Sequence, residues 1–352
     1  MEYPIIKLLL PAVMAFIIGL LLTPVLTHYL FKYKVWKKQG GKTAMNGTVA
    51  TEFNRLKGAD EIKTPRMGGI VIWGSVLITL FVLYLLQAVF TDTVFDDLFF
   101  LSRSQTWLPL SALIIGAGVG FLNDYYDVHH GGVGLRLQVR ILVISLMSVF
   151  IGWWFYAKLG VDSIGIPFDG ALYIGWLIIP FFIILTIAIY ASGVIDGIDG
   201  LSGGVFASVF MAYAGVALVQ SQLDIAAFCA TVAGGIIAFL WFNIPPARFW
   251  MTETGSMPLT LTLAVVVLMT DGLGNGHGIA LLPIIGLPLV ATVASNVLQI
   301  SYRKMTGRKL FKIAPLHHHF EAIGWPSTKV TMRYWIISIM CAIIGLALAT
   351  IM

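Results

Sequence analysis

Five acidic residues lie in segments that are otherwise apolar or rich in glycine: Asp124, Asp127, Asp196, Asp199 and Glu253. Charged groups next to apolar segments of this kind need partners or a function. Their hard oxygen atoms suit Mg²⁺, which usually takes one or two carboxylates together with phosphate oxygens and water. Taken singly, each acid is more typical of helix capping or of a turn. Because they occur together with strongly basic segments, the pattern favours metal–phosphate chemistry.

Three consecutive histidines, His317, His318 and His319, precede Phe320 and Glu321. A pH-sensitive surface patch and an adventitious zinc site are two ordinary explanations for such a run. Adjacent residues on a helix point in different directions, so three neighbouring rings cannot easily serve one ion. We therefore expect one histidine to donate to a phosphate or a sugar while its neighbours pack.

Composition determines where these residues must be placed. The chain has 352 residues, of which 58% are apolar and 11% are charged, whereas soluble domains carry about 25% charged residues. A soluble fold of this length could not bury so much apolar surface, so lipid is the expected solvent. The apolar run 5–31 is too long for a signal peptide and is expected to remain as a first span. Cys229 and Cys341 lie in apolar runs and are expected to be small buried hydrophobes.

The hydrophobic pattern predicts an all-α polytopic membrane protein with about ten transmembrane helices, because a span needs roughly 20 apolar residues. The chain 1–352 is expected to form a single membrane domain. The expected spans are 5–31, 67–90, 107–122, 139–157, 172–190, 203–220, 224–242, 257–271, 279–299 and 334–352.

Lysine and arginine give the orientation, since positive residues stay on the cytoplasmic side. With both termini outside, the cytoplasmic side holds 19 of the 22 basic residues, nine of them in the loop 32–66. The net charge of +5 therefore indicates topology and contact with anionic lipids, and no nucleic-acid partner is expected. Acids outside, such as Asp224 and Asp271, are expected to be solvated loop ends. The expected cytoplasmic loops are 32–66, 123–138, 191–202, 243–256 and 300–333.

Two motifs, Asp196–Leu201 and Thr254–Ser256, are similar to those of the polyprenyl-phosphate N-acetylhexosamine-1-phosphate transferases. The run Pro315–Glu321 resembles the muramoyl-pentapeptide branch of that family. The resemblance covers almost the whole chain. It implies a Mg²⁺-dependent enzyme in the bacterial inner membrane, with its active site facing the cytoplasm. The implied reaction moves phospho-MurNAc-pentapeptide from UDP-MurNAc-pentapeptide to undecaprenyl phosphate, giving lipid I and UMP for peptidoglycan synthesis.

The same resemblance assigns roles to individual positions. It implies catalytic roles for Asp124, Asp196, His317, His318 and His319. It implies substrate binding by Lys63, Arg136, Arg140, Gly197, Ile198, Asp199 and Trp250, with the Trp250 ring under uracil. It implies Mg²⁺ binding by Asp196 and Glu253.

Five positions depart from the family pattern. Asn123 replaces an aspartate that is often proposed as the base, Gly193 an asparagine at the metal, Glu253 an aspartate, Thr252 a glycine and Arg66 a threonine. Asn123 in place of the proposed base is tolerable chemically, because a phosphomonoester has its second pKa at about 6 and is mostly dianionic at neutral pH.

Three other interpretations remain open at this stage. The chain could use another UDP-N-acetylhexosamine, although the three histidines speak against it. It could be a degenerate homologue without catalysis, which Asn123 and Gly193 would explain. A transporter is the third, less favoured because no pair of broken helices is visible in the sequence. The sequence leaves the oligomeric state open, a homodimer included.

Overall fold

The computed structural model describes residues 4–38, 62–90, 93–130, 132, 134–168, 170–273 and 276–352. Helices dominate this part of the chain, because apolar segments in lipid must satisfy their backbone groups internally. The helices are α1 (Pro4–Lys32), α3 (Ile70–Val89), α4 (Val94–Leu98), α5 (Trp107–His129), α6 (Leu137–Leu159), α7 (Ile178–Ala191), α8 (Leu201–Val219), α9 (Leu223–Asn243), α10 (Glu253–Gly272), α11 (Gly278–Ile285), α12 (Leu287–Thr306), α13 (Leu316–Ala322) and α14 (Ser327–Ala349), with 3₁₀ turns η2 (Gly175–Leu177) and η3 (Ser192–Ile195).

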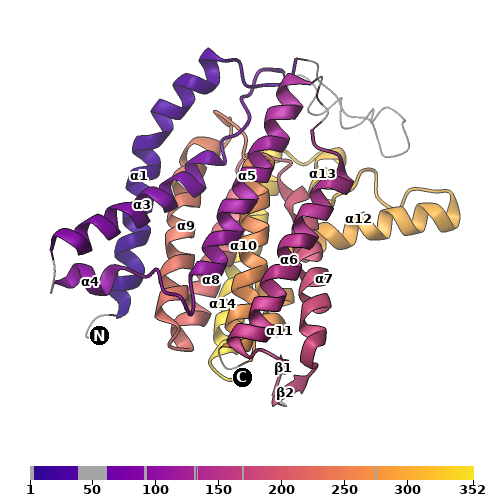
Figure 1. Ribbon diagram of the computed structural model, residues 1–352. Coiled ribbons are helices and arrows are strands. Elements are labelled where there is room, and N and C mark those ends of the chain that lie inside the picture. Colours follow the sequence, from indigo (N-terminus) through magenta and orange to yellow (C-terminus); the bar gives the residue numbers. More distant parts are fainter. Residues whose placement is uncertain are drawn as a thin grey trace.

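Nine helices within the described residues are long and apolar enough to cross a membrane, or ten if α11 and α12 count as one span. The prediction of an all-α polytopic membrane protein is therefore confirmed. Helix α1 begins, and α14 ends, at the lower end of the bundle in Figure 1. We call the opposite end the site end: there α1, α5, α7 and α9 finish, and α3, α6, α8, α10 and α14 begin.

The predicted span 279–299 consists of two helices and not of one straight helix. Helices α11 and α12 form a pair bent by 75° at Gly286, and α12 projects sideways from the bundle (Figure 1). Pro288 stands at the start of α12 and cannot donate a backbone hydrogen bond. This break, which the hydropathy pattern does not reveal, lets α12 leave the axis of the span.

Several predicted boundaries also move, and they move residues of interest from loops into helices. Helix α5 continues to His129, α10 begins already at Glu253, and the loop 300–333 contains the short helix α13. Residues 39–61 of the predicted loop 32–66 lie outside the described residues. An antiparallel hairpin at the lower end, β1 (Ser163–Ile166) with β2 (Gly170–Tyr173), was not expected.

Asp271 corrects another expectation. It is 2% exposed rather than solvated, and its carboxylate accepts hydrogen bonds from the backbone N–H groups of Gly165 and Ile279, both at 2.9 Å. It thus ties β1 and α11 to the end of α10, because a buried carboxylate must find donors inside the protein.

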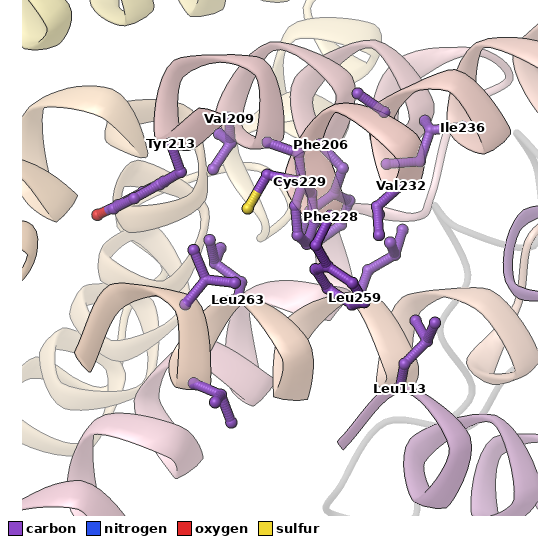
Figure 2. Close-up of a cluster of buried hydrophobic side chains, with 14 of the residues drawn as sticks. Leu113, Phe206, Val209, Tyr213, Phe228, Cys229, Val232, Ile236, Leu259 and Leu263 are labelled. Atoms are coloured by element: carbon purple, nitrogen blue, oxygen red, sulfur yellow. The ribbon is translucent and has the colours of Figure 1, made fainter. Parts of the chain in front are cut away.

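Helix α10 lies at the centre of the bundle and is almost wholly buried. Figure 2 shows its side chains Leu259 and Leu263 facing Phe206 of α8 and Phe228 of α9, with the thiol of Cys229 among them. This dry cluster fixes α10 against its neighbours. The helix that carries Glu253 at its first residue is therefore the best-anchored element of the fold.

Glycines bring α5 into direct contact with α10. A Cβ at Gly116 would lie 2.7 Å from the Cα of Pro258, and a Cβ at Gly120 would lie 2.2 Å from the carbonyl oxygen of Glu253. Small residues at such positions allow two membrane helices to approach backbone to backbone. One turn beyond Gly120, the contact delivers Asp124 to the first residues of α10.

Candidate active site

The site begins where residues 65–69 run beside residues 250–252. The N–H of Trp250 donates to the carbonyl of Pro65 (2.9 Å), and the N–H of Gly68 donates to the carbonyl of Trp250 (2.8 Å). A Cβ at Gly69 would lie 2.3 Å from the Cα of Gly255. The two glycines, Gly68 and Gly69, therefore allow a close backbone approach that joins the start of α3 to the start of α10.

Thr252 connects three parts of the site. Its hydroxyl donates to Oδ2 of Asp124 at 2.5 Å and accepts from the N–H of Met67 at 3.2 Å, while its own N–H donates to Oδ2 of Asp196 at 2.9 Å. Thr252 has φ +54°, a left-handed conformation that glycine adopts without strain. The threonine keeps this backbone shape and adds a hydroxyl that bridges α5 to residues 65–69.

The Asp124 carboxylate is fully occupied by protein donors. Besides Thr252, both the N–H (2.7 Å) and the hydroxyl (2.5 Å) of Thr254 donate to its Oδ2, and Nδ2 of Asn123 donates to its Oδ1 at 3.2 Å. Oδ1 of Asn123 accepts from the N–H of Leu135 at 2.9 Å. In this arrangement Asp124 holds the start of α10, and Asn123 holds the chain between α5 and α6.

Asp196 and Asp199 lie in the turn between η3 and α8. Ser202 donates to Oδ1 of Asp196 at 2.7 Å. Asp199 accepts from the N–H of Ala247 (3.0 Å) and from the indole N–H of Trp250 (3.1 Å). Asp199 therefore fixes the Trp250 ring, the position assigned to uracil by the resemblance, beside the turn that carries Asp196.

Glu253 is held by side chains instead. Its Oε1 forms an ion pair with Arg140 of α6 and accepts from the hydroxyl of Tyr190 on α7 at 3.5 Å. Its side chain is 27% exposed, so water reaches it. Asp127 is paired in a similar way with Arg66, and Lys37 lies 3.9 Å from its other oxygen. Two of the departing residues, Arg66 and Glu253, thus belong to ion pairs.

The three histidines have unequal surroundings. The Nε2 atoms of His318 and His317 would lie 2.6 and 2.8 Å from a Cβ at Gly197, so both rings lie against the Asp196–Asp199 turn. His318 is oriented by Glu321 (2.7 Å), whereas Nδ1 of His319 accepts from the N–H of Lys312. His317 and His318 thus lie against the same turn, whereas His319 faces Lys312, and the expectation that one histidine donates to the substrate stays a prediction.

Some predicted residues lie apart from this cluster. Lys63 and Arg136 are exposed at the site end, and Ile198 is 4% exposed and packs in the core. Gly193 lies near Ser256, whose Cβ would be 3.5 Å from an added Cβ. An added Cβ would make only ordinary van der Waals contacts there, so a close backbone approach does not explain the glycine.

The residues present fit Mg²⁺ held between protein and substrate. Asp124 and Asp196 both accept hydrogen bonds from Thr252, the residue directly before Glu253. Among the described residues, no group of three or more His, Cys, Asp or Glu side chains is arranged around one point as metal ligands. Mg²⁺ does not need such a cage, because it commonly takes one or two carboxylates and completes its shell with phosphate oxygens and water.

Comparison with known proteins adds the family. The model of glycosyl transferase family 4 matches residues 106–271, which contain Asp124, the Asp196–Asp199 turn and Glu253. A phospho-N-acetylmuramoyl-pentapeptide-transferase of Desulforudis audaxviator is 30% identical over 97% of this chain and 98% of its own length. The chain belongs to the phospho-N-acetylmuramoyl-pentapeptide transferase family.

Further relatives in that family carry the same name. Those of Francisella tularensis and Listeria monocytogenes are 30% and 31% identical over 95% and 80% of this chain, and over 91% and 83% of their own lengths. The prediction of family and of transferase activity is thereby confirmed.

Sequence reasoning missed two residues that hold side chains of this cluster in place. Tyr190 touches Glu253, and Ser327 donates to Glu321 at 2.5 Å. Neither residue stands in a recognisable motif. The sequence offered one signal for them: both lie at span ends, Tyr190 close to Asp196 and Ser327 close to the histidines.

Proposed function

We propose that this protein transfers phospho-MurNAc-pentapeptide from UDP-MurNAc-pentapeptide to undecaprenyl phosphate, forming lipid I and UMP as a single membrane domain. The observation that carries the proposal is the convergence of His317 and His318 on the turn that bears Asp196 and Asp199. That convergence brings the most specific motif of the chain, the three histidines, to the acidic turn. The N–H of Thr252, the residue before Glu253, donates to Asp196 of the same turn.

The donor nucleotide would bind between the Asp199 turn and residues 247–250. The Trp250 indole, fixed by Asp199, offers a flat apolar surface to the uracil ring. Gly197 leaves room beside the histidines, since any side chain would collide with them. Lys63 and Arg136, exposed at the site end, would attract the anionic donor from water.

In the transfer, an oxygen of the acceptor phosphate attacks the phosphorus that bears the sugar. The new P–O bond makes a diphosphate, the bond to the UMP oxygen breaks, and UMP departs with that electron pair. Because the acceptor is already largely dianionic at neutral pH, Asn123 need not remove a proton. His317 or His318 would donate to an oxygen of the transferred group, and Arg140 would add positive charge beside Glu253.

Asp196 and Glu253 are the residues that would hold Mg²⁺, which would supply charge against two approaching phosphates and the leaving UMP. We further propose that the site end faces the cytoplasm of a bacterial inner membrane. The basic residues support this orientation. Reporter fusions after Lys38 and Lys312 should then report cytoplasm, and a fusion after Met352 should report the outside.

The test is UMP release by purified protein with Mg²⁺ and undecaprenyl phosphate. UDP-MurNAc-pentapeptide should give UMP and a lipid-linked diphosphate, and UDP-GlcNAc should give little. Release with UDP-GlcNAc alone would assign the protein to another branch. No release with either nucleotide, from protein that unfolds cooperatively on heating, would favour a degenerate homologue.

A further inference from the structure

Helix α14 has two faces with different surroundings. On one face, Thr331 donates to the carbonyl of Asp199 at 3.1 Å, and the indole of Trp335 donates to the carbonyl of Gly200 at 2.9 Å. Lys329 and Arg333, four residues apart, share another face and are exposed. One helix therefore separates these two cations from the acidic turn of the site.

Both cations are held in place by one aromatic ring. Cζ of Arg333 lies 4.2 Å from the ring centre of Trp325, and Nζ of Lys329 lies 5.1 Å from it. Trp325 in turn stacks on Phe320, with ring centres 4.7 Å apart and planes 15° from parallel. Phe320 directly follows the three histidines on α13, so this cation–aromatic cluster is attached to the site.

The charge of this cluster has no ion-pair partner among the residues that the structure describes. No carboxylate in the described part of the chain forms an ion pair with Lys329 or Arg333, and the first turn of α14 contains no acidic residue. Cations near the start of a helix oppose its macrodipole, which favours anions there. Both the side chains and the helix end would therefore be stabilised by an anion.

A stripe of apolar side chains continues along α14 below the two cations. Ile337, Met340 and Ile344 follow at helical spacing on the same side as Arg333, and each is about half exposed. In a membrane helix such side chains face hydrocarbon. The face thus offers positive charge near the membrane surface and an apolar track that leads into the bilayer.

We propose that Lys329 and Arg333 hold the phosphate of the acceptor lipid at the membrane surface before it moves around α14 into the site, while its hydrocarbon chain lies along Ile337, Met340 and Ile344. This proposal rests on the proposed function, since it assigns the acceptor of the same reaction. Two cations match a phosphomonoester, with a charge of about −1.5 to −2, better than a phosphodiester with one. The guanidinium can also bind two phosphate oxygens at once. Lipid phosphate bound there is one helix from Asp199.

The experiment compares Lys329→Gln/Arg333→Gln with Arg308→Gln/Lys309→Gln, a control pair that removes the same charge from exposed positions before α13. Full-length protein in phosphatidylcholine nanodiscs is loaded with undecaprenyl phosphate or with phosphatidylglycerol. Bound lipid is then counted by native mass spectrometry. The test pair should lose undecaprenyl phosphate about tenfold or more, as removal of charged hydrogen bonds does, and should lose phosphatidylglycerol less than threefold. The control pair should match wild type.

Kinetics give the second readout. The KM for undecaprenyl phosphate should rise about tenfold in the test pair, while the KM for the nucleotide and kcat stay within twofold. Arg333→Lys should recover part of the loss, which also separates charge from folding. Unchanged lipid binding would overturn the proposal, and so would equal losses of both lipids, which indicate a general anionic-lipid contact. The lipid-binding assay does not depend on turnover. An inactive wild type would therefore contradict the proposed function, while the binding assay would still test the lipid site.

Discussion

Asp124 and Glu253 lie at the same end of the bundle, but their carboxylates are held in different ways. Asp124 is 1% exposed, and its Oδ2 accepts three hydrogen bonds from Thr252 and Thr254. Glu253 is partly exposed and is held by the long side chain of Arg140. The Thr252 and Thr254 donors are fixed at the start of α10 and hold the Asp124 carboxylate in one geometry. The Arg140 side chain is long, so it can turn from Glu253 to a phosphate and leave the carboxylate to a metal ion. The first carboxylate therefore builds the site, and the second is available for chemistry.

The largest effect on turnover should come from Glu253→Gln. The amide keeps the size of the side chain and can still accept from Arg140, so the midpoint of thermal unfolding should stay within a few degrees. UMP release should fall by about a thousandfold, because a charge beside the transferred phosphates is lost. Turnover within tenfold of wild type would show that Glu253 is dispensable.

Asp124→Asn should lower stability as well as turnover, unlike Glu253→Gln. The amide oxygen can still accept from Thr252 and Thr254, but the NH₂ group then faces the donor Nδ2 of Asn123, and the charge that strengthened these hydrogen bonds is lost, at a cost of about 1–3 kcal/mol. The unfolding midpoint should fall by several degrees, and turnover should fall about a hundredfold with it. Asp97→Asn, at an exposed acid of the opposite end, is the control and should change neither. Full stability in Asp124→Asn would contradict the structural role.

The histidines should rank by their distance from Gly197. Alanine at His317 or His318 should lower turnover about 10- to 100-fold, the range of one hydrogen bond to a charged group. Alanine at His319, which accepts from the backbone of Lys312, should cost about threefold or less. Initial rates of UMP release measure this. Three equal and small losses would instead favour a surface patch.

A smaller change than at His317 or His318 should come from Asn123→Asp. The carboxylate can still accept from Leu135 but meets the charge of Asp124, which predicts a change in rate of about tenfold or less. The assay is UMP release from this variant, from Gly193→Asn and from the double variant. Inactive wild type that Asn123→Asp revives would show that an aspartate base is required.

Much of the fold was predictable because lipid imposes simple rules. The apolar segments and the charge asymmetry gave nearly every span, since each must bury about 20 residues in hydrocarbon. The bend between α11 and α12 was not predictable from hydropathy, because both arms are apolar. The burial of Asp271 was missed for a related reason: its partners are backbone N–H groups of β1 and α11, which leave no trace in side-chain patterns.

The site was predicted as a set of residues, but not as an arrangement. Sequence placed Asp196, Asp199, Glu253 and the histidines at one end, and the structure joins them through Thr252 and Gly197. In sequence, Asn123, Thr252 and Arg66 were visible only as departures from the family pattern. Each has a partner in the structure, because a buried polar group is stable only when it is hydrogen-bonded or paired. Nothing in the structure explains Gly193.

Binding of Mn²⁺, a spectroscopic substitute for Mg²⁺, tests the assignment of Glu253 to the metal most directly. Wild type, Glu253→Gln and the control Asp97→Asn are titrated with Mn²⁺ in the presence of UMP, and free Mn²⁺ is followed by electron paramagnetic resonance. Wild type and the control should bind one ion per chain with equal affinity. Glu253→Gln should bind at least tenfold more weakly at an unchanged unfolding midpoint. Equal affinity in all three proteins would contradict the assignment of Glu253 to the metal.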